Sequence, residues 1–334
     1  MHSSRGCVIS VTLVAAAMLF APAASAARQN ETPGRPQTPG RPTSGNQSPA
    51  APGNQTPAKP AEPPPVAGTP LYISPGIVLQ IQQKLLTLGY PVPTLSGAWG
   101  DNSAAALGQF QQKLGLDAGG DLDELTLAAL DMAQVLKGEL PPGGDAAVSA
   151  SAIASGGAPL AASPRLTRVV QNKLADAGFP PHNVFGIWVA AIDNAPRNFQ
   201  KAKGLDITNT LDLQVIHALG VTDSLTNAKP GKLPTDHVVA VLSDKAVILT
   251  GTPLTVSAHG VRQVQTALVQ RGHKDVIVDG KWSDAVTGVL KKFQEAQKLE
   301  PTGSINLRTL RALGFNNPLN DLDRPTPAPS KPTK

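Results

Sequence analysis

The feature that most constrains this chain is a pattern that occurs three times with the same internal spacing. Each copy opens with Pro-Leu-x-x-Ser, which ends at Ser74, Ser163 and Ser257. A Gln, a Gly, a Gly-x-Trp, a Phe-Gln and a closing Ala-Leu then follow at fixed offsets from that serine. No gap is needed inside a copy, and only the segments between copies differ in length. Such self-similarity indicates one structural unit repeated three times.

The recurring residues form series with one member per copy. In chain order they are Gln82, Gln171 and Gln265; Gly89, Gly178 and Gly272; Trp99, Trp188 and Trp282; Phe110, Phe199 and Phe293; and Gln111, Gln200 and Gln294.

Local signals predict three short helices in every copy. The three serines are typical N-caps, and the Gly series suits the left-handed position that ends a first helix. A second helix carries the Phe inward, and Asp123, Asp212 and Asn306 cap a third. The sequence therefore predicts an all-α protein of three small three-helix bundles joined by flexible linkers. Each bundle has about 60 residues, near the lower limit for an independent core.

Composition separates the copies from their surroundings, because much of the Pro and Gly lies in runs that favour disorder. The predicted order is a signal peptide (1–26), a Pro-rich spacer (27–69), module 1 (70–135), a linker (136–158), module 2 (159–222), a connecting segment (223–252), module 3 (253–318) and a disordered tail (319–334).

The N-terminus has the pattern of an export signal. Arg5 precedes an apolar stretch at 8–21, which is short for the roughly 20 residues that span a bilayer. Ala24-Ser25-Ala26 offers a cleavage site, although an uncleaved anchor is the alternative. Cys7 is the only cysteine and would leave with the signal, so the mature chain would carry no thiol. We therefore expect a periplasmic, secreted or wall-associated protein.

At these residues the chain resembles the peptidoglycan-binding-like domain family, which occurs beside many bacterial cell-wall hydrolases. Copy one carries the pattern best, with Gly97-Ala98-Trp99-Gly100, Phe110-Gln111 and Gly115-Leu116. Copy three follows it with Gly280-Lys281-Trp282 and Phe293-Gln294. The resemblance implies binding of peptidoglycan, through its glycan or its stem peptides, and a cell-wall enzyme as a further partner.

Copy two departs from this pattern. Pro196 falls inside the expected second helix, and Val189 stands where copy one has Gly100. An interior proline removes a hydrogen bond and clashes with the preceding turn, so we expect this helix to start late or to kink.

Candidate ligand-binding residues come from the Gly-x-Trp loops, the start of the second helix and the fixed amides. The Trp rings could stack on a ligand or close the core, the amides could bind a stem peptide or a loop carbonyl, and the polar residues could receive an anion or cap the helix. The candidates are Gln82, Trp99, Asp101, Asn102, Ser103, Gln111, Gln265, Trp282, Ser283, Asp284 and Gln294.

Motifs for catalysis are not found. The sequence shows no metal-ligand spacing, no nucleophile elbow and no phosphate-binding loop, so we expect no enzyme, cofactor or metal. The net charge of +5 is spread too thinly for nucleic-acid binding, and beyond the signal peptide no contact with the membrane is expected. The function expected is non-catalytic wall binding. The alternatives are an envelope adaptor that binds a protein such as a wall hydrolase, and a wall-modifying enzyme.

Overall fold

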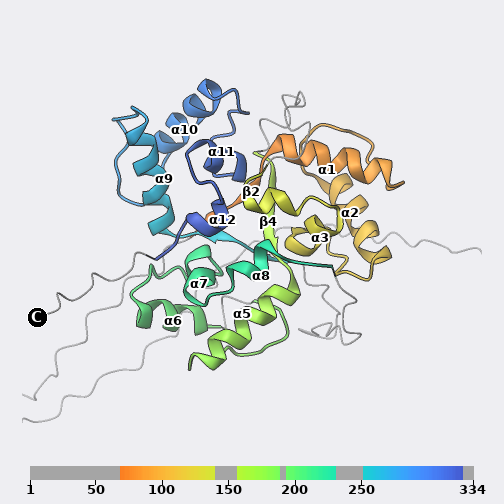
Figure 1. Ribbon diagram of the computed structural model, residues 1–334, viewed down its shortest axis with the longest axis horizontal. Coiled ribbons are helices and arrows are strands. Elements are labelled where there is room, and N and C mark those ends of the chain that lie inside the picture. Colours follow the sequence, from red (N-terminus) through yellow and green to blue (C-terminus); the bar gives the residue numbers. More distant parts are fainter. Residues whose placement is uncertain (1–67, 140–155, 189–192, 231–250, 326–334) are drawn as a thin grey trace, which may run out of the picture. The chain divides into compact units, whose positions relative to one another are not determined.

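The computed structural model describes residues 68–139, 156–188, 193–230 and 251–325, and within them it is mostly helical, as predicted (Figure 1). Each copy contributes three helices at equivalent positions. They are α1 (Pro75–Thr87), α2 (Asp101–Lys113) and α3 (Glu124–Ala129) in copy one; α5 (Pro164–Asp176), α6 (Ala195–Lys203) and α7 (Leu213–Ala218) in copy two; and α9 (Ala258–Gln270), α10 (Asp284–Ala296) and α11 (Leu307–Ala312) in copy three. The predicted signal peptide and nearly all of the Pro-rich spacer lie outside the described residues.

The predicted caps account for where these helices begin and end. Ser163 Oγ accepts a hydrogen bond from the N–H of Leu166, and Ser257 caps α9 in the same way. Ser74 occupies the cap position but makes no side-chain capping bond. The Gly that follows each first helix has a φ between +88° and +95°, the left-handed region that glycine adopts without strain. The third helices are capped by the side chains of Asp123, Asp212 and Asn306.

The core of each copy centres on the predicted Phe, which is buried in all three. Each Phe meets the aromatic residue that follows the first helix in an edge-to-face contact, with ring centroids 5.6 to 6.2 Å apart. The pairs are Tyr90–Phe110, Phe179–Phe199 and His273–Phe293.

The second helix of copy two starts late, as the sequence predicts. The helix α6 begins at Ala195 with Pro196 in its first turn, where a missing N–H costs nothing. It has 9 residues, whereas α2 and α10 have 13 each.

Short strands that the sequence did not reveal join the copies. The segment that opens each copy is extended, and these entry segments pair with one another antiparallel. At their centre the Leu of each Pro-Leu-x-x-Ser is buried, and three backbone bonds form a closed triangle. Leu71 N–H donates to Leu254 O (3.2 Å), Leu254 N–H to Leu160 O (3.1 Å) and Leu160 N–H to Leu71 O (3.0 Å). The strands are β1 (Thr69–Pro70), β2 (Tyr72–Ile73), β4 (Ala158–Ala162), β5 (Thr252–Pro253) and β6 (Thr255–Val256).

Each entry segment also pairs with the copy before it, at the start of that copy's third helix. In copy one, β3 (Leu122–Asp123) runs parallel to β4. Thr255 N–H donates to Leu211 O, and Tyr72 N–H donates to Ile305 O. The pairing therefore runs from copy one to two, from two to three and back to one. We call residues 69–73, 158–162 and 252–256 the entry hub.

A further short helix follows each copy, and these three helices pack against one another. They are η1 (Ala133–Lys137), α8 (Thr222–Thr226) and α12 (Pro318–Asp321). Each buries a leucine six positions after the closing Ala-Leu of its copy, at Leu136, Leu225 and Leu319.

These contacts correct the predicted boundaries and the prediction of independent bundles. The predicted linker (136–158), connecting segment (223–252) and tail (319–334) contain Leu136, Leu225 and Leu319, which the structure buries. Gly157, also placed in the linker, has a φ of +94°, and a Cβ there would lie 1.9 Å from the carbonyl oxygen of Ile73. One buried leucine on a single helical turn leaves no periodic pattern, so these helices cannot be predicted from hydrophobic periodicity. Residues 140–155 and 231–250 lie outside the described part.

Pairing between copies can be tested with cysteines. Ala161 and Pro253 are directly opposed in the antiparallel β4–β5 ladder, so their side chains share one face. With Cys7 replaced by Ser, we expect the pair Ala161→Cys and Pro253→Cys to form an intramolecular disulfide on mild oxidation. Non-reducing mass spectrometry measures it. The control pair Ala161→Cys and Thr252→Cys is one position out of register and should cross-link far less. Equal yields would contradict this register.

Candidate ligand-binding surface

The Gly-x-Trp segments have the same surroundings in all three copies. In each, the Gln of the first helix accepts a hydrogen bond from the Gly N–H and donates one to the carbonyl just before the Trp. The Gly bonds measure 2.8 Å at Gly97–Gln82, 2.9 Å at Gly186–Gln171 and 2.8 Å at Gly280–Gln265. The bonds to Ala98, Ile187 and Lys281 measure 2.8, 2.6 and 3.0 Å. The loop is therefore held on its helix by a buried amide.

The second set of glutamines holds the loop between the second and third helices. Gln111 Oε1 accepts from Gly120 N–H (2.9 Å), and its Nε2 donates to Thr126 Oγ1 (2.9 Å). Gln294 bonds Gly303 and Thr309 in the same way, at 2.8 Å each. The sequence left open whether these amides bind a stem peptide or a loop of the protein itself, and the structure shows them bonded to the loops.

The three Trp side chains are half-buried and pack against the core through part of each ring. Trp99 and Trp282, each partly exposed, lie two residues before the starts of α2 and α10. Asp101 and Asn102 are exposed there in copy one, and Ser283 and Asp284 in copy three. Ser103 differs, because its buried hydroxyl accepts from Gln82 Nε2 (2.9 Å).

An exposed apolar residue recurs two positions before the Gly of each Gly-x-Trp. Leu95, Val184 and Val278 are 41, 42 and 45% exposed. An apolar side chain that is exposed at the same place in three copies favours contact with a ligand or with another protein. Sequence reasoning missed these residues, although aligning the copies at Gly-x-Trp would have shown an apolar residue at this loop position in all three.

Together these groups define the Trp face of a copy. In copy one it comprises Leu95, Trp99, Asp101 and Asn102, and in copy three Val278, Trp282, Ser283 and Asp284. Six of the eleven predicted site residues lie on the two faces. The other five are buried: Gln82, Ser103 and Gln265 under the Gly-x-Trp loops, and Gln111 and Gln294 under the loop between the second and third helices.

The residue just before Gly-x-Trp shapes the turn in the loop. Asp279 accepts from the N–H of Lys281 (2.8 Å), and Ser96 Oγ accepts from Ala98 N–H (3.1 Å). The bond from Lys281, aided by Gln265, lowers the pKa of Asp279, so this position carries a negative charge at neutral pH. Copy two has Phe185 here, which offers no acceptor and is exposed.

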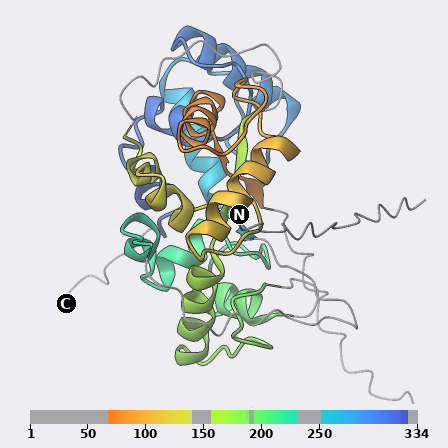
Figure 2. The same cartoon turned by 90° about the vertical axis from the view of Figure 1, so that its right-hand side faces the viewer.

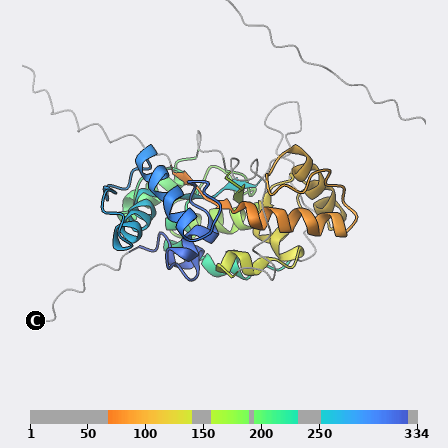
Figure 3. The ribbon, with the colours of Figure 1, turned by 90° about the horizontal axis from the view of Figure 1, so that it is seen from above.

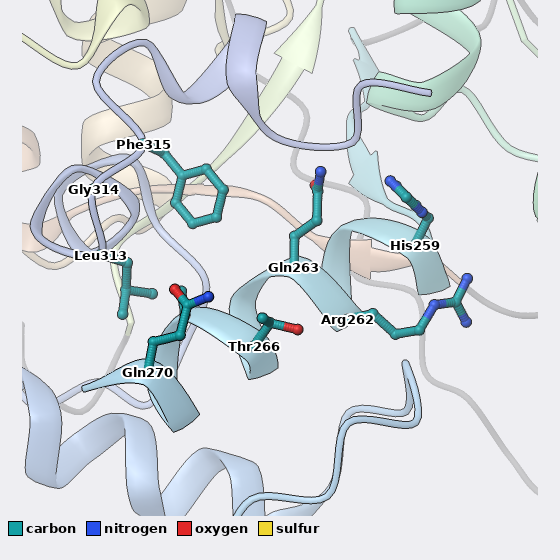
Figure 4. Close-up of a pocket in the computed structure, with 9 residues that line it drawn as sticks. His259, Arg262, Gln263, Thr266, Gln270, Leu313, Gly314 and Phe315 are labelled. Atoms are coloured by element: carbon teal, nitrogen blue, oxygen red, sulfur yellow. The ribbon is translucent and has the colours of Figure 1, made fainter. Parts of the chain in front are cut away.

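A separate pocket of 440 Å³ lies in copy three, between α9 and residues 313–315 (Figure 4). Gln263, Thr266 and Gln270 line one side, and the ring of Phe315 lies opposite Gln263. Arg262, at the far end, is paired with Asp206 at 3.3 Å. The lining mixes these polar side chains with Leu313 and Phe315, the pocket is open, and it lies on a different side of α9 from the buried Gln265.

The strongest electrostatic perturbations lie between copies, away from the Trp faces. Burial, with the nearby Asp123, raises the pKa of Glu124 to about 8, and Glu124 accepts from the N–H and Oγ–H of Ser163 in copy two. Burial, with Asp323, raises the pKa of Asp212 to about 8, and Asp212 accepts from Thr208 Oγ1 (2.6 Å). Both carboxyls are buried, although Glu124 also lines a pocket of about 260 Å³ together with Arg165 of copy two and Lys229.

Neither a metal cluster nor a membrane span is found in the described part of the chain. No group of three or more His, Cys, Asp or Glu side chains there could hold a metal ion. Its helices are all too short or too polar to cross a bilayer.

Comparison with known proteins finds a family match for two of the copies. Residues 74–130 and 257–313 match the family described as "Putative peptidoglycan binding domain". These two segments are the first and third copies, and together they cover about a third of the chain. The equivalent residues of copy two, 163–219, do not match. No curated protein matches the chain, and no solved structure does.

Removing a buried amide should destabilise the protein. In Gln265→Ala the N–H of Gly280 loses its buried acceptor, which costs about 1 to 3 kcal/mol. Urea unfolding followed by circular dichroism measures the change. The control Gln270→Ala removes an exposed amide from the same helix and should change stability by less than about 0.5 kcal/mol. Equal effects would contradict a structural role for Gln265.

The raised carboxyl pKa values predict how stability depends on pH. Glu124 ordinarily titrates near 4.5 but has a pKa of about 8 in the folded chain, so the folded state holds an extra proton between these values. The contribution of this extra proton to the free energy of unfolding is therefore complete below about pH 4.5. It is lost as the pH rises through 8, at up to about 1.4 kcal/mol per pH unit. Urea unfolding from pH 5 to 9 should show a smaller loss of stability in Glu124→Gln than in the wild type.

The matched control for this measurement is Glu295→Gln, which changes an exposed carboxyl. This variant should keep the wild-type dependence of unfolding free energy on pH. An unchanged slope in Glu124→Gln would contradict a protonated Glu124.

Proposed function

We propose that this chain is an exported, non-catalytic cell-wall protein that binds peptidoglycan through its Trp faces. The observation that carries the proposal is the match of copies one and three to a peptidoglycan-binding family, since those matched segments contain both faces. The loops that form the faces are fixed by the buried amides of Gln82 and Gln265. The faces are therefore pre-formed, which lowers the entropy cost of binding.

The chemistry of a Trp face suits a polymer of sugars and short peptides. The exposed part of Trp99 and the side chain of Leu95 offer an apolar contact for the C–H face of a sugar ring or for an alanyl methyl group. Asp101 and Asn102 lie at the edge of that contact, where they reach hydroxyl and amide groups. A shallow surface of this kind suits weak binding at several places better than one deep site.

The proposal that the protein is not an enzyme rests on where its reactive groups lie. Glu124 and Asp212, whose pKa values are raised as a general acid requires, are buried between copies and bonded to Ser163 and Thr208. Export is inferred from the sequence of residues 1–26, with cleavage after Ala26.

A second candidate function is an adaptor that binds a protein such as a cell-wall hydrolase. The exposed apolar residues Leu95, Val184 and Val278 favour it, because such residues also occur at protein interfaces. The two functions differ in whether purified wall, free of protein, is sufficient for binding.

Co-sedimentation with protein-free sacculi tests the function. The intact mature protein should pellet with sacculi, and the double variant Leu95→Glu, Val278→Glu should bind about ten-fold more weakly or worse, since a charge replaces an apolar contact on both faces. The control Leu114→Glu changes an equally exposed leucine at the far end of α2 and should bind like the wild type. Failure of the intact protein to pellet, with capture of an envelope protein instead, would favour the adaptor.

A further inference from the structure

The two Trp faces belong to a closed ring of three copies. Three equivalent leucines bond in a triangle, and each entry segment pairs with the preceding copy, with copy three leading back to copy one. A pairing that closes after three equivalent steps relates successive copies by a rotation of about one third of a turn, as in a cyclic trimer. The chain is thus an approximate trimer made from one polypeptide.

Contacts outside the triangle hold the copies in this arrangement. The helices η1, α8 and α12 pack together around buried leucines. Glu124 of copy one holds both the N–H and the hydroxyl of Ser163 in copy two. Asp206 of copy two accepts from the N–H of His259 and pairs with Arg262 in copy three. Independent reorientation of a copy would break several of these bonds together.

The first helices extend away from the entry hub in different directions. The Gly-x-Trp turns lie against the starts of these helices, because a Cβ on Gly186 or Gly280 would meet the carbonyl oxygen of Pro164 or Ala258. Ser74, Ser163 and Ser257, where these helices start, are buried beside the hub. Gly89, Gly178 and Gly272, where they end, have open space beside them. Figures 1 and 3 show α1 and α9 extending away from each other, and Figures 1 and 2 show α5 taking a third direction.

Rotation between the faces decides how a linear polymer can bind. Each face binds a strand in the same orientation relative to its own copy. The rotation that relates one copy to the next therefore places the second bound strand along a different line from the first. If the strand lies parallel to the axis, the result is a set of separate parallel strands. Whether the strand lies parallel to the axis or at an angle to it, one straight strand cannot occupy two faces.

We propose that the protein cross-links separate peptidoglycan strands and does not bind one strand at several points. This inference rests on the proposed function, because it assumes that the Trp faces bind the polymer. It differs from avidity along one strand, which flexible linkers between the copies would permit.

Light scattering with soluble strands tests the inference. The probe is uncross-linked glycan bearing stem peptides, released from sacculi by an endopeptidase. With the intact mature protein, scattering should rise several-fold at intermediate ratios and fall again in excess protein. The variant Val184→Glu, Val278→Glu leaves only the face of copy one, so it should bind strands in sedimentation velocity but give no rise. The control Leu114→Glu should behave like the wild type.

Two outcomes overturn the inference while leaving the function in place. One is wild-type binding of the strands with no rise in scattering. The other is loss of scattering when the hub is locked by the Ala161→Cys, Pro253→Cys disulfide, because cross-linking would then need an open ring. If the wild type binds neither strands nor sacculi, the proposed function fails and the inference fails with it.

Discussion

The structure depends on a triangle of backbone hydrogen bonds that no copy can make alone. The N–H and C=O groups of Leu71, Leu160 and Leu254 are buried with their side chains, and a buried backbone group without a partner costs free energy comparable to a lost hydrogen bond. The carbonyl of each leucine accepts a hydrogen bond from one neighbouring copy, and its N–H donates one to the other. Copies of about 60 residues have small cores, so the apolar surface buried at this junction is a large share of what stabilises each one.

Features that act within one copy could be predicted from sequence. Capping side chains such as Asp123, the left-handed Gly89, the buried Phe110 and the late start of α6 at Pro196 all depend on neighbours close in the chain or on one helix face. The junction between copies could not be predicted. Its strands span only two to five residues, too few to show an alternating pattern, and the partner of Leu71 is 183 positions away in the sequence.

The sequence indicates a candidate surface but not which of its polar residues are exposed on it. Sequence placed it at the Gly-x-Trp loops, which the structure holds on the first helix in all three copies. It could not tell that Gln82 points under the loop while Asp101 points outward, since both are polar residues near the same turn. A side-chain amide is buried where backbone groups need a hydrogen-bond partner, as the N–H of Gly97 does. Only the folded loop shows where such groups lie.

Copy two shows which residues the ring needs and which belong to the Trp face. It keeps the hub residue Leu160 and the buried amide of Gln171, and these make the same bonds as their equivalents in the other copies. Its differences lie in the loop before Trp188, where Phe185 is exposed, and at the start of the second helix, where Pro196 is in the first turn of α6. Because the triangle closes only with three members, copy two is required for the fold whatever it binds. The position of the other two faces therefore depends on a copy that does not match their family.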